Sequence, residues 1–365
     1  MSTRLPHVRE RKQESRRRSS VPSLIEFLFL PGLAPVVAEE LRSRLPQLGE
    51  LYQVDGRADS LEAEYTGDWK RLLSLRTIVA PFLVLTFPVP RPRSLTSSEY
   101  FPRILEAVQL VARINREPID TFRIDAAGSS SAGFRQLADQ IEDSTGLAEV
   151  AEGGDVLLRF RRSARLDGWD VLVRLSLRPL SSRDWRVQNL PGAANATIAA
   201  AMSLMTSPRP GDRVLNLMCG SGTLLIERLL MAPARLAVGV DIDQESLSYC
   251  AENLDAAGLR GRANLLNCDI TDEEWLELGP FDVIMADPPW GTLMGGHDSN
   301  EALHMLLLDR AYAAAAPDSC LAVLTHEIRI MERCLRRAAG KWSESDVLRV
   351  FQKGHNPRIY LLARR

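Results

Sequence analysis

The chain has 365 residues, of which 45% are hydrophobic and 25% charged, and its formal net charge is −2. This length exceeds what one hydrophobic core usually supports, so two or three domains are expected, and the composition excludes a disordered or fibrous protein. No apolar stretch approaches the roughly 20 residues that a membrane helix needs, which predicts no membrane partner. The five cysteines form no C-x-x-C pair, which predicts reduced thiols, a cytoplasmic protein and no metal site.

Residues 1–20 form a basic tail. They contain seven Arg or Lys and two Glu, a net charge of +5, so the rest of the chain sums to −7. The start, M-S-T-R-L-P-H-V-R-E-R-K, has no apolar core and therefore does not resemble a secretion signal. We expect a disordered, solvated extension. Attraction to nucleic-acid phosphates is the alternative interpretation.

Residues 21–92 form the first predicted domain. A strand is expected at 23–30 and a helix after Pro31-Gly32, followed by a short strand at 61–65, a helix at 68–75 and a strand at 77–87. This alternation predicts a small α+β unit. The stretch F-P-V-P-R-P-R-S-L after it has the composition of a linker.

Residues 93–180 form the second predicted domain. Helices are expected at 103–115 and 136–144, a strand at 121–126, and a hairpin at 156–177 that turns at 166–168. Residues 93–186 hold 14 arginines and 14 acids, so composition alone indicates no basic face. The sequence leaves open whether six of these arginines converge: Arg123, Arg135, Arg159, Arg161, Arg162 and Arg165.

Residues 181–365 show a strand–helix–strand rhythm. Strands are expected at 213–217, 236–240, 263–267, 281–286 and 320–325, and the chain ends in a hairpin at 347–363. Strands separated by helix-length segments predict an α/β fold with a parallel, doubly wound sheet.

The first of these strands leads into N-L-M-C-G-S-G-T. Gly220 and Gly222 lie where a strand turns into a helix, the place where a backbone approaches a ligand closely. Leu225 replaces the third glycine of the dinucleotide-binding motif. The loop therefore favours a nucleoside-type cofactor over a diphosphate, although a plain structural turn explains the loop equally well.

The next two strand ends carry acids. Asp241 follows Gly220 by 21 residues, the position where doubly wound folds place an acid on ribose hydroxyls. Asp269, between Cys268 and Ile270, is expected to face an adenine edge. Because the carboxyl ends of parallel strands meet at one edge of a sheet, these positions predict a cofactor-binding rim.

The fourth strand ends in D-P-P-W-G. Asp287 and the carbonyl group of Pro288 are suited to hold the two hydrogens of an exocyclic amine, while Pro289 stiffens the loop. Trp290 offers a stacking face for a base, worth about 1–3 kcal/mol. The alternative is structural, with Asp287 as a helix cap and Trp290 in the core.

Residues 214–291 resemble class I S-adenosylmethionine-dependent methyltransferases. The combination N-L-M-C-G-S-G-T-L-L-I-E, V-G-V-D-I-D and D-P-P-W-G is similar to that of the RNA guanine-N2 methyltransferases that carry a THUMP domain. This resemblance implies a ferredoxin-like domain at 21–92, a THUMP-like RNA-binding domain at 93–180 and a Rossmann-like methyltransferase domain at 181–365. Catalysis is then expected at Asp287, Pro288, Pro289 and Trp290. S-adenosylmethionine is expected at Asn195, Thr197, Asn216, Met218, Cys219, Gly220, Ser221, Gly222, Thr223, Asp241, Ile242, Asp269 and Ile270.

Asn216 stands where the family has an acid. Its amide oxygen still accepts a hydrogen bond but contributes no charge to cofactor binding. The resemblance implies a tRNA partner with guanine 6 or 10 as target. Alternatives are a ribosomal RNA guanine-N2 methyltransferase, a DNA adenine-N6 or cytosine-N4 methyltransferase, and an RNA-binding protein without catalysis.

Overall fold

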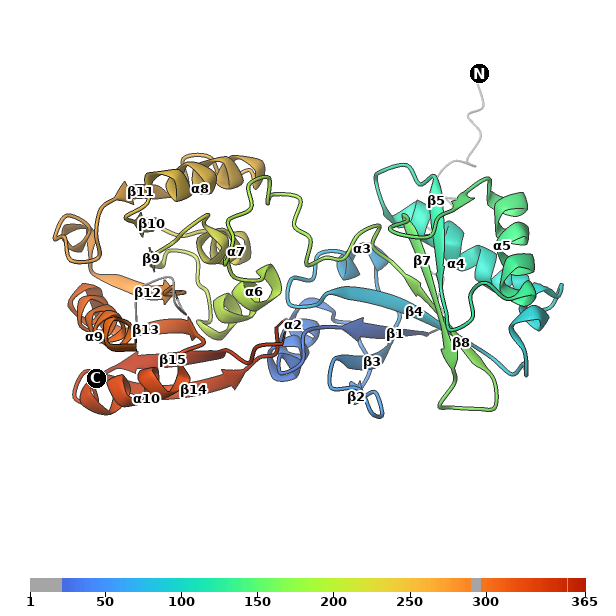
Figure 1. The fold of residues 1–365 in the computed structure, drawn as a ribbon, viewed down its shortest axis with the longest axis horizontal. Helices are drawn as coiled ribbons and strands as arrows, with labels where there is room; N and C mark the ends of the chain where they lie inside the picture. The colour runs from blue at the N-terminus through green and yellow to red at the C-terminus, as the bar shows by residue number, and fades with distance from the viewer. Residues whose placement is uncertain (1–21, 290–296, 353) are drawn as a thin grey trace, which may run out of the picture.

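The computed structural model describes residues 22–289, 297–352 and 354–365. They fold into two lobes that lie side by side along the longest axis of the molecule (Figure 1). An eight-stranded sheet organises the N-terminal lobe and a seven-stranded sheet organises the C-terminal lobe. Among these residues no helix combines the length and the apolar character needed to span a membrane.

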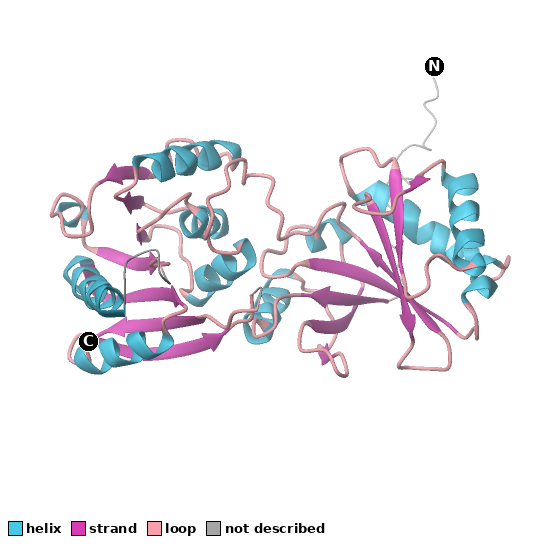
Figure 2. Ribbon diagram, viewed as in Figure 1, coloured by secondary structure: helices cyan, strands magenta, loops and turns pink. Residues whose placement is uncertain are grey.

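The N-terminal lobe contains one mixed sheet in the order β2-β3-β1-β4-β8-β7-β5-β6. Its elements are β1 (Ser23–Leu28), α2 (Ala34–Arg44), β2 (Tyr52–Gln53), β3 (Ser60–Tyr65), α3 (Trp69–Leu72), β4 (Ala80–Phe87), the 3-10 helix η1 (Pro92–Thr96), α4 (Phe101–Ile114), β5 (Thr121–Asp125), α5 (Ala132–Thr145), β6 (Ala148–Glu149), β7 (Val156–Arg162) and β8 (Trp169–Arg174). Helices α4 and α5 lie together at the end of the lobe far from the second sheet (Figure 2).

The two N-terminal units expected from the sequence share this sheet. Strand β4 of the first unit pairs with β8 of the second in antiparallel register, with Leu83 opposite Val173. Gly168 lies where a Cβ atom would be 2.1 Å from the carbonyl oxygen of Phe87, so the hairpin before β8 packs directly on the end of β4. The boundary at 92/93 stays a prediction, since the sheet runs through it.

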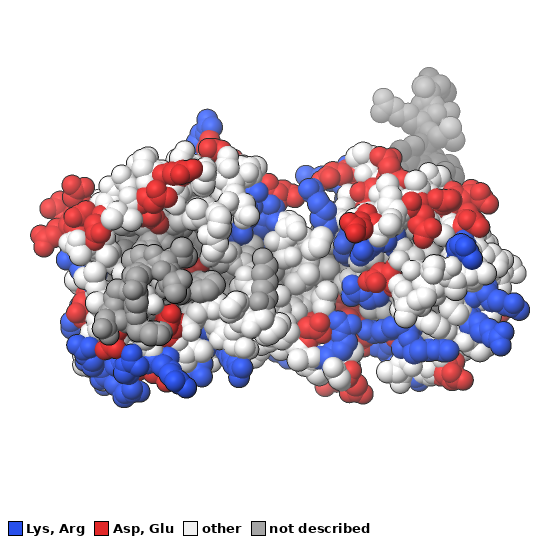
Figure 3. Space-filling view, viewed as in Figure 1, with Lys and Arg blue, Asp and Glu red and all other residues white. Residues whose placement is uncertain are grey.

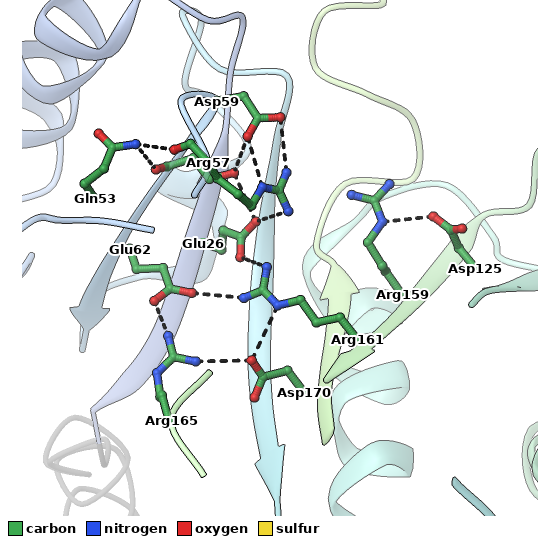
Figure 4. Close-up of polar contacts among 11 residues, drawn as sticks. Glu26, Gln53, Arg57, Asp59, Glu62, Asp125, Arg159, Arg161, Arg165 and Asp170 are labelled. Carbon is green, nitrogen blue, oxygen red and sulfur yellow. Dashed lines mark hydrogen bonds and ion pairs between the residues drawn. The ribbon is translucent and has the colours of Figure 1, made fainter. Parts of the chain in front are cut away.

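A network of ion pairs joins β1, β3, β7 and β8 (Figure 4). Arg161 lies 2.7 Å from Glu26, 3.3 Å from Glu62 and 3.4 Å from Asp170. Arg165 also pairs with Glu62 and Asp170. Of the six arginines that the sequence singled out, Arg161 and Arg165 therefore converge, but they pair with acids that neutralise their charge.

The C-terminal lobe has the strand order β11-β10-β9-β12-β13-β15-β14. Its elements are α6 (Ala196–Met205), β9 (Arg213–Leu217), α7 (Thr223–Met231), β10 (Leu236–Asp241), α8 (Gln244–Ala256), β11 (Asn264–Asn267), the 3-10 helix η2 (Leu276–Leu278), β12 (Phe281–Ala286), α9 (His297–Ala314), β13 (Ala315–Thr325), α10 (Ile328–Arg337), β14 (Trp342–Arg349) and β15 (Arg358–Arg364). The strands are parallel except at β15, which runs antiparallel to both of its neighbours. Apolar clusters cover the two faces of this sheet.

This topology confirms the expected α/β fold, a doubly wound C-terminal sheet preceded by an α+β region. Chain order reverses direction between β9 and β12. In such sheets ligands bind beyond the carboxyl ends of the strands at that switch point.

Buried charges join the two lobes. Glu227 on α7 is fully buried and accepts hydrogen bonds from Arg76 at 2.7 and 2.9 Å and from Arg183 at 2.8 Å. Arg76 belongs to the N-terminal lobe, and its backbone N–H donates to the buried Glu40 of α2 at 2.8 Å. A second contact brings Pro31 to the terminal hairpin, because the N–H of Phe351 donates to its carbonyl at 2.9 Å.

Candidate active site

A cavity of about 630 Å³ opens at the carboxyl edge of the C-terminal sheet, at the β9/β12 switch point. It lies within the range of small-molecule and cofactor sites. Its walls come from the connector before α6, the loop after β9, the ends of β10 to β12, and α9. The lining residues predicted from the sequence are Met218, Cys219, Gly220, Ser221, Thr223, Asp241, Ile242, Asp269, Ile270, Asp287, Pro288 and Pro289.

The loop after β9 has a tightly constrained backbone. Met218, Gly220 and Gly222 all adopt left-handed φ angles, +51°, +52° and +85°. A bulky residue such as methionine rarely does so, and such strain concentrates at ligand sites. Gly222 is required for a second reason, since a Cβ atom there would lie 2.4 Å from the Sγ atom of Cys250.

Asp241 fixes this loop from the end of β10. Its Oδ2 atom accepts a hydrogen bond from the N–H of Gly220 at 2.7 Å, and its Oδ1 atom accepts one from the N–H of Asp243 at 3.0 Å. The adjacent Ile242 is 69% exposed and lines the cavity. An acid beside an exposed apolar side chain suits a ligand that combines hydroxyl groups with a flat ring.

Asp269 lies in the turn after β11. Its Oδ1 atom accepts hydrogen bonds from the backbone N–H of Thr271 at 2.8 Å and from its hydroxyl group at 2.7 Å. These bonds hold the pKa of Asp269 below its usual value. The carboxylate therefore stays ionised while it lines the cavity wall.

Asp287 follows β12 and lines the cavity. Its Oδ1 atom is buried and has no hydrogen-bond partner among the described residues. Burial raises the pKa of Asp287 to about 7. Buried polar atoms are almost always hydrogen-bonded, so an unpaired carboxyl oxygen in a cavity indicates a group that acts on a ligand. Trp290, predicted to stack on that ligand, lies outside the described residues.

Four other predicted cofactor residues do not line the cavity: Asn195, Thr197, Asn216 and Gly222. Asn195 caps α6, where its Oδ1 atom accepts from the N–H of Thr197 at 2.8 Å and from the hydroxyl of Thr197 at 2.6 Å. Asn216 is fully buried inside the sheet, and its Nδ2 atom donates to the carbonyl of Met285 at 3.1 Å. Its Oδ1 atom is buried without a described partner. Gly222 lies behind the cavity wall, against Cys250.

The connector before α6 supplies a wall that the sequence did not reveal, residues 190–194. Arg186 fixes it, since its Nη2 atom donates to the carbonyl of Ala194 at 3.0 Å and to the Thr223 hydroxyl at 2.9 Å. Asn253 holds the same connector to the glycine loop, because its Nδ2 atom donates to the carbonyls of Gln188 and Ser221, each at 3.1 Å. The family resemblance pointed to the adjacent Asn195 and Thr197 instead, because residues 190–194 carry no polar side chain.

Cys219 is held as a thiol. It is 7% exposed, and a hydrogen bond with Cys250 together with burial raises the pKa of Cys219 well above its usual value. A thiol in this state is a poor nucleophile. Cys219 therefore serves as a small packing residue of the loop.

Comparisons with known proteins place these features in a family. Residues 183–358 match the UPF0020 family, described as an RMKL-like methyltransferase domain. The chain is 28% identical over 346 residues to the tRNA (guanine(6)-N2)-methyltransferase of Thermus thermophilus, covering 93% of this chain and 98% of that protein. A shorter match, 36% identical over 104 residues, covers 27% of this chain and 49% of the rRNA N(6)-adenosine-methyltransferase metl-5 of Caenorhabditis elegans.

The crystal structure of TrmN from Thermus thermophilus superimposes with a TM-score of 0.71 at 23% identity, covering 94% of this chain and 100% of that one. The two-lobed fold is therefore shared over nearly the whole length. The match to the family model falls on the C-terminal lobe, which holds the cavity and its glycine loop. Residues 183–358 thus resemble an RMKL-like methyltransferase domain.

Proposed function

We propose that this chain transfers a methyl group from S-adenosylmethionine to the exocyclic N2 amine of a guanine in tRNA, at position 6 or 10. The observation that carries the proposal is the buried Oδ1 atom of Asp287, which has no described partner and lies in the cavity. Similarity over 93% of the chain to a tRNA guanine-N2 methyltransferase supports the choice of substrate.

The cavity fits the cofactor in chemistry and in size. Asp241 and Asp269 stand at two neighbouring strand ends, where they would accept from ribose hydroxyls and an adenine amine, while Ile242 and Ile270 would contact the flat ring. The loop at 218–223 would hold the methionine part, with the buried amide oxygen of Asn216 close by in sequence. When bound, S-adenosylmethionine supplies a methyl group on a positively charged sulfur.

Asp287 performs the remaining chemistry. The guanine amine is a poor nucleophile because its lone pair is delocalised into the ring, so the site must orient the nitrogen and remove a proton late. A carboxylate with a pKa of about 7 is poised for that proton at neutral pH. Pro288 and Pro289 line the cavity beside Asp287 and stiffen its loop. A guanine in a stem must be flipped out to reach it, at a cost of a few kcal/mol.

Two features weigh against other methyl acceptors. Carbon-5 methylation of pyrimidines requires a nucleophilic cysteine, whereas the pKa of Cys219 is raised. Methylation of adenine N6, the target named for the nematode relative, uses the same amine chemistry, so the chemistry does not decide between the two bases. The extent of similarity favours guanine, because the nematode match covers 27% of this chain while the tRNA enzyme matches both lobes.

All five cysteines are free thiols, which supports a cytoplasmic location.

The test is a methylation assay with labelled S-adenosylmethionine and unmodified tRNA, ribosomal RNA or DNA, followed by identification of the product nucleoside by mass spectrometry. We expect N2-methylguanosine in tRNA, and a loss of at least about 100-fold in kcat for Asp287→Ala. Methyladenine in any nucleic acid would overturn the guanine assignment. Product in ribosomal RNA alone would overturn the tRNA assignment.

The matched control is Asp255→Ala. Asp255 is an exposed acid on α8, and its described ion pair is with the exposed Arg260. We expect this variant to retain wild-type activity, which separates loss of the Asp287 carboxylate from loss of a negative charge in general.

A further inference from the structure

Helix α10 carries a concentration of positive charge. Its residues 328–337 contain four Arg and one Glu, although the chain as a whole has a net charge of −2. One side of the helix packs into the core, while the exposed side is basic. We define the α10 patch as its four exposed arginines: Arg329, Arg333, Arg336 and Arg337. Basic side chains gather over α10 in the space-filling view (Figure 3).

The charge of the patch is only partly balanced. Glu301 on α9 pairs with both Arg333, at 2.8 Å, and Arg337, at 3.1 Å, so one acid serves two arginines. Within the described ranges no acid pairs with Arg329 or Arg336. Glu332, the acid of α10 itself, pairs with Arg358 on β15 at 2.7 Å. The exposed side of α10 therefore keeps excess positive charge.

Helix stability does not account for Arg329. It lies in the first turn of α10, where the positive end of the helix dipole disfavours a cation. It also stands four residues before Arg333, and like charges at this spacing destabilise a helix. Arg329 therefore destabilises its own helix in two ways, which points to a binding partner outside α10.

The patch begins at the edge of the sheet that holds the active site. Strand β13 pairs with β12 so that Val323 lies opposite Ala286, which brings Leu324 level with Asp287. Helix α10 starts three residues after the end of β13, so Arg329 lies near this edge. Arg336 follows about 10 Å farther along the helix. The patch is thus a basic strip that leads away from the site of methyl transfer.

In the N-terminal lobe, the arginines of the central ion-pair network offer no excess positive charge, because acids neutralise them. Arg161 and Arg165 are paired with Glu62 and Asp170. An RNA substrate needs cations to replace the counterions of its phosphates. Unpaired arginines of α10 meet that need beside the active site.

We propose that the α10 patch binds the phosphate backbone of the RNA strand adjacent to the target nucleotide. The proposal rests on the proposed RNA substrate and assigns it a contact on the catalytic lobe. Arginine is suited to this role because its planar guanidinium group binds phosphate oxygens in pairs.

The test compares Arg329→Glu/Arg336→Glu with the control Arg260→Glu/Arg262→Glu. The control changes charge equally, and its arginines lie in the loop between α8 and β11, at the opposite edge of the sheet. The Kd for tRNA is measured across salt concentrations, together with kcat at saturating tRNA and the Kd for S-adenosylmethionine. We expect the patch variant to weaken tRNA binding about tenfold and to make the slope of log Kd against log salt shallower by 1 to 2.

For Arg329→Glu/Arg336→Glu, cofactor affinity and kcat at saturating tRNA should stay within about twofold of wild type, which shows that this variant is folded. Arg329→Gln/Arg336→Gln should change the Kd for tRNA and the salt slope in the same direction by a smaller amount. An unchanged salt slope with wild-type methylation of tRNA would overturn the patch and leave the proposed function standing. A wild-type protein that methylates DNA and not RNA would overturn the proposed function, and the same variants would then report whether the patch binds that nucleic acid instead.

Discussion

At the scale of a single residue, Asp287 is expected to trade stability for activity. Its pKa rises from 3.8 to about 7 because the carboxylate is desolvated. Because the pKa is higher in the folded state, the protonated carboxyl group of Asp287 contributes to the free energy of unfolding. This contribution is fully present below the unfolded pKa of 3.8 and is lost as the pH rises through about 7. Activity should follow the opposite trend, since Asp287 in its proposed role as a base would act only when ionised.

The Asp287→Asn variant tests both consequences. At pH 8 we expect its free energy of unfolding to exceed that of wild type by on the order of 1–4 kcal/mol, the upper value being that of the full pKa shift. At pH 4 the difference should nearly vanish. Urea unfolding at the two pH values gives this comparison, and kcat/KM against pH should rise through about 7 for wild type. A variant that is less stable than wild type at pH 8 would contradict the unpaired state of the Oδ1 atom.

At the scale of an element, the loop between β9 and α7 depends on Gly222 for two separable reasons. Its φ of +85° disfavours any side chain, and a Cβ atom would lie 2.4 Å from the Sγ atom of Cys250. Gly258 isolates the first reason, because its φ is +71° but nothing lies within 4 Å of its Cβ position. We expect Gly258→Ala to cost about 1–2 kcal/mol, and Gly222→Ala to cost clearly more and to weaken cofactor binding.

A double-mutant cycle separates the steric part. Cys250→Ala removes the Sγ atom and leaves the nearest contact at 3.4 Å. Gly222→Ala should therefore cost less in the Cys250→Ala background, with a coupling of about 0.5–3 kcal/mol measured by denaturant unfolding. Strict additivity of the two changes would show that the loop moves away from Cys250 instead.

The same loop shows what local sequence determines. The glycines, Asp241 and Asp287 were predicted because strand ends in a parallel sheet meet at one edge, and all but Gly222 line the cavity. Arg186 and Asn253 were missed, since each acts on chain segments distant in sequence and carries no motif. The pairing of β4 with β8 was missed for the same reason. Asn195 and Thr197 follow the wall residue Ala194 directly, in a cap that sequence alone does not distinguish from a ligand contact.

At the scale of the whole molecule, the two lobes must hold a fixed relation if one binds the RNA that the other modifies. Glu227 helps to hold the two lobes in place, since it is fully buried and pairs with Arg76 of the N-terminal lobe and Arg183 of the connector. Desolvation lowers the pKa of Arg183, while the charge of Glu227 opposes that shift. Removing the acid leaves two guanidinium groups facing each other in a buried site.

We therefore expect Glu227→Gln to lower the free energy of unfolding by about 3–5 kcal/mol. We also expect kcat/KM for tRNA to fall by about 10- to 100-fold, because a displacement of about 1 Å at the reacting atoms has an effect of this size. The Kd for S-adenosylmethionine should change much less, since the cavity is built within the C-terminal lobe. Asp255→Asn, which removes an acid from the exposed pair with Arg260, should leave all three quantities unchanged. Equal losses in tRNA turnover and cofactor binding would mean that Glu227 supports the C-terminal lobe alone, whereas a selective loss in tRNA turnover assigns it to the alignment of the two lobes.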